Sequence, residues 1–391
     1  MKKYIFILFA FYLSATLAAQ TTAIPDTNFE QALIDLGIDS DGTLNGQVDT
    51  ADVVGVEDLD LVGTSIQDLT GIQDFAALKN LDAYNNPVQI VDLSQNIQLE
   101  VVSFYFALFE TLDLTNNPNL INLYAQQCSL QEVILGNKPF LENIYVGTVT
   151  FDLGINNFIS SIDVDNCPNL KILKCDLNNI SSLNLQNSPL LEELDVSSNN
   201  LSTLDLSNNN NLRVLRAGKI DDDSTDPSNP NLQSLDLSNN SNLEEVRLSR
   251  TNLYNLNLKN GNNENIDLVA GSLISNLSCV QVDDATAATN GEPPYDNWYF
   301  DEQVSYSEDC SLGIPENNFE IGLYPNPIKN FVTITSNGTA IKKIKVLTIS
   351  GTKIMGVLNH NSIDLSSLSS GVYFLLIETD KGKVIKKVVK L

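Results

Sequence analysis

Hydrophobic and polar positions follow one short phrase along this chain, L-x-x-L-x-L, which recurs every 10 or 11 residues between Val56 and Val282. From Leu81 onward the spacings alternate 10, 11, 10, 11, so one coil holds 21 residues and two extended segments. Two spacings are longer, 18 residues from Ile144 to Ile162 and 20 from Leu215 to Leu235, and they indicate loop insertions that leave the register intact. A fixed repeat of this length predicts a solenoid, whose function lies on a repeated outer surface.

Side chains alternate along a strand, so the fourth and sixth residues of each phrase are expected to point inward and the fifth and seventh outward. Leu194 and Val196 would then pack, whereas Asp195 and Ser197 are displayed. A small polar residue often stands at the ninth position, where it can satisfy backbone groups of the turn. These residues are Thr64, Asn86, Cys128, Asn178, Asn199 and Thr251; the polar group is missing at Ala107, Val149 and Ile220, which leaves the local pairing there open.

Residues 190–201, L-L-E-E-L-D-V-S-S-N-N-L, match the L-x-x-L-x-L-x-x-N-x-L core of leucine-rich repeats, and the chain resembles that family over more than half its length. The resemblance implies a mainly β fold: a leucine-rich-repeat solenoid of about 21-residue coils with a helical N-terminal cap, followed by a small C-terminal β-sandwich. We assign residues 56–282 to the repeats.

Both ends of such a stack need a cap, because a terminal coil would expose its apolar face. Residues 20–55 form the predicted front cap, with a helix from Thr27 to Gly37 in which Thr27 and Glu30 have capping-box spacing. Residues 283–310 form the predicted rear cap, and we expect a disulfide between Cys279 and Cys310 to hold it. The cysteines at 128, 167 and 175 have no metal-site spacing.

The two ends of the chain predict export. Residues 1–19 have two lysines, an apolar run and small residues before Gln20, which is typical of a secretory signal peptide cleaved after Ala18 or Ala19. No other segment is long and apolar enough for a transmembrane span in the mature chain. After a linker, residues 311–322, the phrase disappears and residues 323–391 alternate as strands with a turn at Asp380-Lys381-Gly382.

Residues 323–391 open with L-Y-P-N-P and continue with I-S-G-T-K-I, L-S-S-G-V-Y and a lysine-rich terminus. In these motifs the segment is similar to the C-terminal sorting domain of the Bacteroidetes type IX secretion system. The resemblance implies that the type IX machinery is a partner of this segment, that the tail is removed after export, and that the passenger is released or linked to surface lipopolysaccharide. The alternative is a β-sandwich that only binds sugar or protein.

The passenger, which lies between the signal peptide and Leu323, and the tail, residues 323–391, also differ in charge. Between the signal peptide and Leu323 stand 10 basic and 46 acidic residues, whereas the tail holds 10 basic and 3 acidic ones. An acidic passenger repels phosphate backbones, so we expect no nucleic-acid partner. High negative charge also serves solubility without any recognition.

Catalytic chemistry finds little support, and we expect neither an enzyme nor a cofactor. The single histidine, His360, lies in the tail, and the chain has no G-x-S-x-G, P-loop or G-x-G-x-x-G motif. Aspartates at one outward position of successive L-D-L phrases are a by-product of repetition; they are Asp92, Asp113, Asp163, Asp205 and Asp236.

Residues 39–52 form a weak candidate for a calcium site, with a plain loop as the alternative. The side chains that could supply oxygen ligands are Asp39, Asp41, Asn45, Asp49 and Asp52. The acidic residues 221–223 and 226, in the second insertion, are expected to be solvated.

Recognition is expected on the concave sheet formed by the asparagine-bearing segments. Exposed Tyr and Arg anchor protein interfaces, although strands favour tyrosine anyway. The predicted patch contains Tyr84, Tyr105, Phe106, Tyr124 and Tyr145, continued by Arg216, Arg247 and Arg250. The other segments, such as 204–209 and 235–240, display Asp, Ser and Asn and are interpreted as solvated filler. We therefore expect an exported, adhesin-like repeat protein that binds an unknown extracellular protein, with a glycan-binding module or a structural spacer as alternatives.

Overall fold

The computed structural model of this 391-residue chain describes residues 20–147, 156–219, 228–310, 321–336, 340–348, 353–358, 360–379 and 383–391. Two compact units divide the chain, Met1–Cys310 and Ser311–Leu391. The predicted signal peptide and most of the predicted linker lie outside the described residues, as do Val149, Ile220, the acidic residues 221–223 and 226, and the turn at 380–382.

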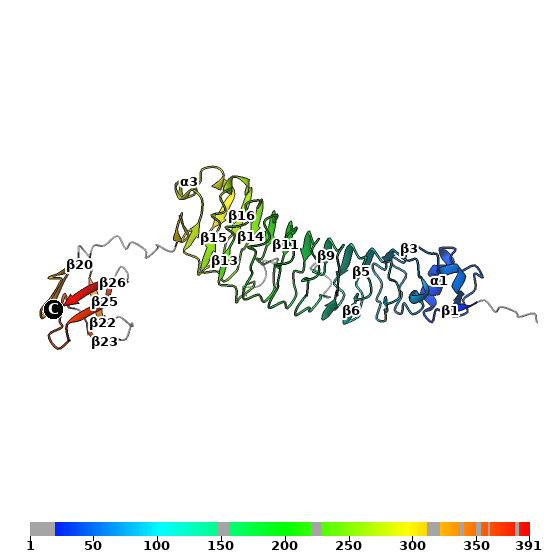
Figure 1. Ribbon diagram of the computed structural model, residues 1–391, viewed down its shortest axis with the longest axis horizontal. Helices are drawn as coiled ribbons and strands as arrows, with labels where there is room; N and C mark the ends of the chain where they lie inside the picture. Colours follow the sequence, from blue (N-terminus) through cyan, green and yellow to red (C-terminus); the bar gives the residue numbers. More distant parts are fainter. Residues whose placement is uncertain are drawn as a thin grey trace, which may run out of the picture. The chain divides into compact units, whose positions relative to one another are not determined.

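The first unit is a solenoid with an 11-stranded parallel sheet along one edge, called the long sheet below (Figure 1). Its strands pair in register, so that Leu81 lies opposite Val102 and Leu173 opposite Leu194. The predicted leucine-rich-repeat solenoid is thereby confirmed. The strands are β3 (Asp58–Asp60), β4 (Asn80–Asp82), β5 (Val101–Tyr105), β7 (Asn122–Gln126), β9 (Asn143–Tyr145), β10 (Ile172–Lys174), β11 (Glu193–Asp195), β12 (Val214–Arg216), β14 (Glu245–Arg247), β16 (Leu268–Gly271) and β18 (Trp298–Phe300).

The opposite face of the solenoid carries shorter and less continuous pairing. One sheet has two strands, β6 (Thr111–Asp113) and β8 (Glu132–Ile134); another has four, β13 (Ser234–Asp236), β15 (Asn255–Asn257), β17 (Cys279–Gln281) and β19 (Ser305–Ser307). Short 3-10 turns, η1 (Ile72–Asp74) and η2 (Asn263–Asn265), lie between extended segments. A single hydrophobic core runs from Ile24 to Trp298 between the two faces, and burying it is the main force that stacks the coils.

Buried asparagines follow the long sheet as a ladder, here called the sheet-side ladder: Asn86, Asn157, Asn178, Asn199 and Asn229. Each side chain accepts a backbone N–H through Oδ1 and donates to backbone carbonyls through Nδ2. Asn157 and Asn229 stand after the two insertions. The expectation of a missing polar group in these two coils was wrong, because each insertion lies between the strand and its ladder residue.

A second ladder, here called the opposite ladder, follows the other face: Asn96, Asn117, Lys138, Asn209 and Asn240, none of them exposed. Their side-chain nitrogens donate to backbone carbonyls of neighbouring coils, as Asn209 does to Leu185 at 3.1 Å and to Ser188 at 2.8 Å. The interpretation of segments 204–209 and 235–240 as solvated filler is therefore corrected, since the last asparagine of each is a core residue. The sequence shows these asparagines only as members of polar runs.

Both predicted caps contain ordered elements. At the front, β1 (Thr21–Ala23) pairs with β2 (Gln47–Asp49), and α1 (Thr27–Asp35) and α2 (Thr50–Val53) flank them. The N-cap of α1 is Asp26 rather than Thr27, because the Asp26 carboxylate accepts the N–H groups of Asn28 and Phe29. Glu30 accepts the N–H groups of 45, 46 and 47 instead of closing a capping box.

The rear of the solenoid contains α3 (Ala285–Asn290), η3 (Tyr295–Asn297) and the last strands of both faces, β18 and β19. Cys279 and Cys310 form a disulfide with a Cα–Cα distance of 5.9 Å. This bond ties β17 to the segment that follows β19.

The second unit is a small antiparallel β-sandwich. Three strands form one sheet, β20 (Ile321–Tyr324), β21 (Phe331–Ser336) and β24 (Ser362–Asp364); four form the other, β22 (Ile341–Leu347), β23 (Lys353–Leu358), β25 (Gly371–Thr379) and β26 (Lys383–Lys390). Both sheets contribute to one core, with Val332 and Ile334 from the first and Ile344 and Ile377 from the second. The predicted sandwich is confirmed.

Candidate binding surface

A row of side chains crosses the middle of the long sheet at the fifth position of each phrase, here called the central row: Tyr124, Tyr145, Lys174, Asp195, Arg216 and Arg247. Each residue lies directly beside the next, because the strands pair in register at about 4.8 Å spacing. The row changes from aromatic to charged along the sheet. The predicted patch contained four of these residues and omitted Lys174 and Asp195, which the repeat places at the same position.

The aromatic end of the central row consists of two parallel rings. Tyr124 and Tyr145 stack with centroids 5.0 Å apart and planes at 13°. The Lys174 ammonium lies 5.5 Å from the centroid of the Tyr145 ring. Tyr124 and Lys174 belong to the strands on either side of Tyr145. Both faces of the Tyr145 ring are therefore covered, and burial raises the pKa of its hydroxyl.

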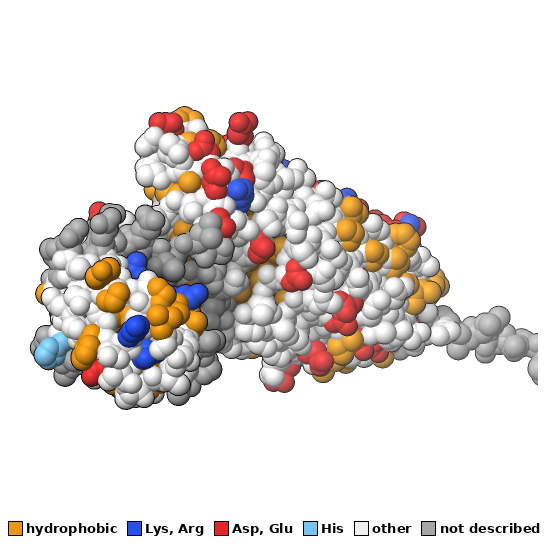
Figure 2. All heavy atoms as spheres, turned by 60° about the vertical axis from the view of Figure 1, so that its left-hand side comes forward, with side chains coloured by type: hydrophobic (Ala, Val, Ile, Leu, Met, Phe, Trp, Pro, Cys, Tyr) orange, Lys and Arg blue, Asp and Glu red, His pale blue; other side chains and the backbone are white. Residues whose placement is uncertain are grey.

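A second aromatic pair lies at the seventh position, on β5 and the coil before it. Tyr84 and Tyr105 stack at 4.6 Å with planes at 5°, and the Phe106 ring lies 4.0 Å from that of Tyr105. Tyr84 is 42% exposed, whereas Tyr105 is only 4% exposed. The expectation that Tyr105 is displayed was wrong: its neighbours cover the ring, and its hydroxyl donates to Gln127 Oε1 at 2.8 Å. Figure 2 shows hydrophobic side chains along the upper edge of the solenoid, which carries β3 to β9 in Figure 1.

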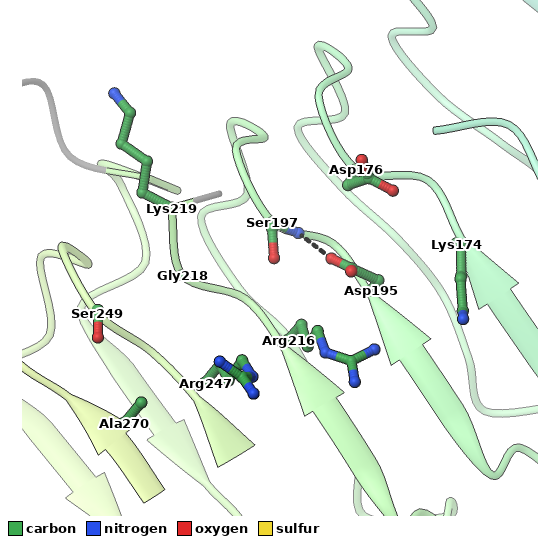
Figure 3. Close-up of a pocket in the computed structure, with 10 residues that line it drawn as sticks. All are labelled: Lys174, Asp176, Asp195, Ser197, Arg216, Gly218, Lys219, Arg247, Ser249 and Ala270. Carbon is green, nitrogen blue, oxygen red and sulfur yellow. Dashed lines mark hydrogen bonds between the residues drawn. The ribbon is translucent and has the colours of Figure 1, made fainter. Parts of the chain in front are cut away.

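The charged end of the central row lines a pocket of about 390 Å³ (Figure 3). Its lining residues are Lys174, Asp176, Asp195, Ser197, Arg216, Gly218, Lys219, Arg247, Ser249 and Ala270. Gly218 allows the backbone of the next coil to approach closely, because a Cβ on it would lie 2.8 Å from Ser249 N. Lys174 pairs with Glu193 at 3.2 Å. The third predicted arginine, Arg250, lies outside this lining, in the following turn with φ 62°.

One glutamate organises the two arginines. Arg216 Nε lies 3.0 Å and Arg247 Nε 2.6 Å from the same Glu245 Oε1. Although burial opposes ionisation of Glu245, its bonds and charges with the two arginines hold its pKa below the usual range. Desolvation raises the pKa of Asp195, more than the neighbouring Arg216 and Lys174 lower it. The pocket thus combines fixed positive groups with the carboxyls of Asp176 and Asp195, and burial makes that of Asp195 costly to ionise.

Aspartates on the opposite face have a structural role that explains their spacing. Asp92, Asp113, Asp163, Asp205 and Asp236 each accept the N–H of the residue two positions later at 2.9 to 3.0 Å. These bonds hold the pKa of Asp92, Asp113 and Asp205 low. The regular ladder of carboxylates therefore closes turns of its own coils.

The weak calcium candidate lies in the front cap. Asn45 Nδ2 donates to Asp41 Oδ2 at 2.8 Å, and Asp41 Oδ1 accepts the hydroxyl of Thr43 at 2.7 Å. Asp39 is buried, its Oδ2 has no hydrogen-bond partner among the described residues, and burial raises its pKa. Asp49 belongs to β2, opposite Thr21. Among the described residues, no group of three or more His, Cys, Asp or Glu side chains is placed to hold a metal ion.

The remaining reactive groups are buried or remote. The thiols of Cys128, Cys167 and Cys175 are free but fully buried, and desolvation raises the pKa of the first two to about 12. Such thiols stay protonated and are poor nucleophiles. His360 lies exposed in the second unit. In the part of the chain that the structure describes, no helix is both long and apolar enough to cross a membrane.

Comparison with known families identifies the second unit. Residues 322–391 match the family described as secretion system C-terminal sorting domain. No curated protein matches the chain in sequence. The chain therefore joins a leucine-rich-repeat solenoid to a type IX sorting domain, and it is an exported repeat protein of the cell surface or the medium.

Solved structures similar to the chain include proteins of two bacterial species. The functional domain of InlJ from Listeria monocytogenes is 19% identical, with 96% of this chain and 99% of that chain covered and a TM-score of 0.41. An internalin C2 from the same species is 19% identical, with 68% and 98% covered and a TM-score of 0.42. A leucine-rich-repeat protein of Leptospira interrogans is 15% identical, with 65% and 76% covered and a TM-score of 0.34. Likenesses this remote carry no argument about function.

Proposed function

We propose that the exported solenoid binds another extracellular protein through its long sheet, in the manner of an adhesin. The observation that carries this proposal is the central row, in which two tyrosines and, after Lys174 and Asp195, two arginines stand in register on consecutive strands. Tyrosine and arginine contribute most to protein interfaces, because they bury large areas with little loss of entropy and make directed polar contacts. The solenoid holds them on a rigid surface, which reduces the cost of binding.

The stacking of the rings supports a protein partner over a glycan. Sugars dock on exposed ring faces, but Tyr145 is covered on both faces and Tyr84 and Tyr105 cover each other. Stacked tyrosines leave their ring edges to a partner, and edges suit the mixed polar and apolar contacts of protein interfaces. Tyr105 is excepted, because it is buried and its hydroxyl donates to Gln127.

Residue variety also favours the long sheet over the opposite face. The opposite aspartates use their carboxylates to close their own turns. Asp195 on the long sheet does the same, but the outward row there varies from coil to coil, from tyrosine through lysine and aspartate to arginine. A surface that varies along a regular scaffold can be specific for one partner.

In-cell crosslinking tests this function. The full chain is crosslinked on intact cells, and captured proteins are identified by mass spectrometry for the wild type and for a Tyr84→Ala, Tyr124→Ala double variant. We expect the variant to lose a specific protein that the wild type captures. Tyr254→Ala is the matched control, since Tyr254 is 49% exposed and directly precedes β15 on the opposite face.

Two results would contradict the proposal. Capture that is equal in the double variant and the wild type would remove the long sheet as the binding surface. Binding of the wild type on a glycan array without any captured protein would favour a glycan-binding module, and failure of both assays would favour a spacer.

A further inference from the structure

The two arginines of the pocket have unused donors. Arg216 and Arg247 direct Nε to Glu245, and within the described part of the chain their Nη atoms form no hydrogen bond or ion pair. The Arg216 side chain is 29% exposed and that of Arg247 is 50% exposed. A guanidinium fixed through Nε presents its two Nη groups as a planar fork, which matches the two oxygens of a carboxylate.

We propose that this pocket binds a carboxylate side chain of an acidic, extended peptide segment of the protein partner; the proposal rests on the function proposed above. Glu245 holds both guanidinium groups on adjacent strands and thereby preorganises them. The 390 Å³ volume has room for a glutamate or aspartate side chain and its flanking backbone. The lining also holds Lys174, which is paired with Glu193 at 3.2 Å, Lys219, and the carboxyls of Asp176 and Asp195.

Charge complementarity favours an acidic segment at this place on the solenoid. Between the signal peptide and Leu323 there are only 10 basic residues against 46 acidic ones, and eight of the 10 lie between Lys171 and Lys259. An acidic peptide is repelled by most of this surface and attracted to the pocket. Such contrast fixes the orientation of a partner more than it raises raw affinity.

Uronic acids of a glycan carry the same carboxylate, but the surroundings of the pocket favour a peptide. The ring nearest to the pocket along the central row is Tyr145, and both its faces are covered. A sugar therefore lacks a stacking platform beside the arginines. A peptide needs none, because its backbone bonds to polar lining groups such as Ser197 and Ser249.

A peptide titration tests the pocket on the full chain. The probe is a fluorescent, capped hexapeptide that alternates serine and glutamate, compared with its serine and glutamine analogue and with polygalacturonate. We expect the acidic peptide alone to bind, with affinity falling as salt rises. Arg216→Gln and Arg247→Gln should each weaken binding by about tenfold, the loss of one charge-assisted contact.

Arg213→Gln is the matched control. It removes the same charge from the same strand region, but the Arg213 fork is already occupied by Glu244, at 2.9 Å through Nε and 2.8 Å through Nη2. We expect a change below about twofold, because only long-range charge is lost. Arg247→Lys keeps the charge and loses the fork, so it should still weaken binding severalfold. Circular dichroism confirms that each variant is folded.

The outcomes separate this inference from the proposed function. Equal losses in Arg213→Gln and Arg216→Gln, no preference for glutamate over glutamine, or tighter binding of polygalacturonate would each overturn the carboxylate pocket. If any of these occurs while the tyrosine variants still lose the crosslinked protein, the long sheet remains the binding surface and only the pocket is rejected.

Discussion

The two faces of the solenoid use the same residue type in two different ways. In the sheet-side ladder each asparagine uses both its oxygen and its nitrogen, as Asn178 does with Ile159 N at 2.9 Å and Val146 O at 3.0 Å. In the opposite ladder only the nitrogens are used, and Oδ1 of Asn96, Asn117, Asn209 and Asn240 accepts no hydrogen bond within the described residues. The comparison teaches that the face whose ladder asparagines use both oxygen and nitrogen also carries the continuous sheet and the varied surface.

This difference has a physical reason. A buried amide oxygen without a donor costs free energy, whereas one that accepts a backbone N–H holds the turn in a single conformation. The sheet-side turns are therefore fixed more firmly, and side chains displayed beside them keep their places. Four tests break or sharpen the comparison.

Removal of one asparagine from each ladder should have the largest effect. Asn178→Ala leaves one N–H and its carbonyl partners buried without a bond, and we expect a loss of about 3 to 5 kcal/mol in the free energy of unfolding. Asn209→Ala removes two donated bonds but also an unpartnered oxygen, so we expect only about 1 to 2 kcal/mol. Urea unfolding of the full chain measures both. Equal losses would show that the ladders do not differ.

Lys138 replaces asparagine in the opposite ladder, where Nζ donates to Leu114 O at 2.7 Å. Burial lowers its pKa from 10.5 to about 8. Between these pH values the unfolded chain binds a proton that the folded chain has released, so the free energy of unfolding should rise with pH, by on the order of 3 kcal/mol. Below about pH 8 Lys138 is protonated in both the folded and the unfolded chain, so its contribution to the free energy of unfolding no longer changes with pH.

Lys138→Asn is the control for this pH dependence. It restores the ladder residue of the neighbouring coils and removes the titrating group, so the rise between pH 8 and 10.5 should disappear. A rise of the same size in the variant would assign the effect to other groups.

Within one stacked pair, Tyr105 is a buried core residue and Tyr84 is an exposed surface residue. Tyr105→Ala empties a buried site and should cost about 2 to 3 kcal/mol in the free energy of unfolding. Tyr84→Ala removes an exposed ring and should cost less than about 1 kcal/mol. Thermal unfolding compares the two, and similar shifts in Tm would mean that Tyr84 is also a core residue.

The smallest expected effect is a difference between the pKa values of Asp195 and Asp205. Both accept a serine N–H two residues later at 3.0 Å. Desolvation raises the pKa of Asp195, whereas bonds to Ser207 lower that of Asp205. A carboxyl NMR titration should place Asp195 above and Asp205 below the ordinary value of 3.8. Charge on Asp195 opposes folding as pH rises through its pKa, while the stabilisation from Asp205 is lost as pH falls.

Several parts of the fold were predictable from local pattern. The inward leucines set the coil length, and the register of Tyr124, Tyr145 and Arg216 on the central row follows from counting. The sandwich followed from strand alternation in the tail. By contrast, Asn157 and Asn229 could not be recognised as ladder residues, because each stands after an insertion that shifts it from the ninth position.

Periodicity by itself determined the architecture of this protein, because buried leucines at a fixed spacing allow only one way to stack. The motifs of the sorting tail determined its route of export, because they are contiguous in the sequence. Exposure and pairing were decided by the tertiary structure. Tyr105 is buried because Tyr84 and Phe106 cover it, and Arg216 and Arg247 share Glu245 because adjacent coils bring them together. Side chains about 4.8 Å apart across strands compete for the same space and the same acceptors, and no single repeat encodes the outcome.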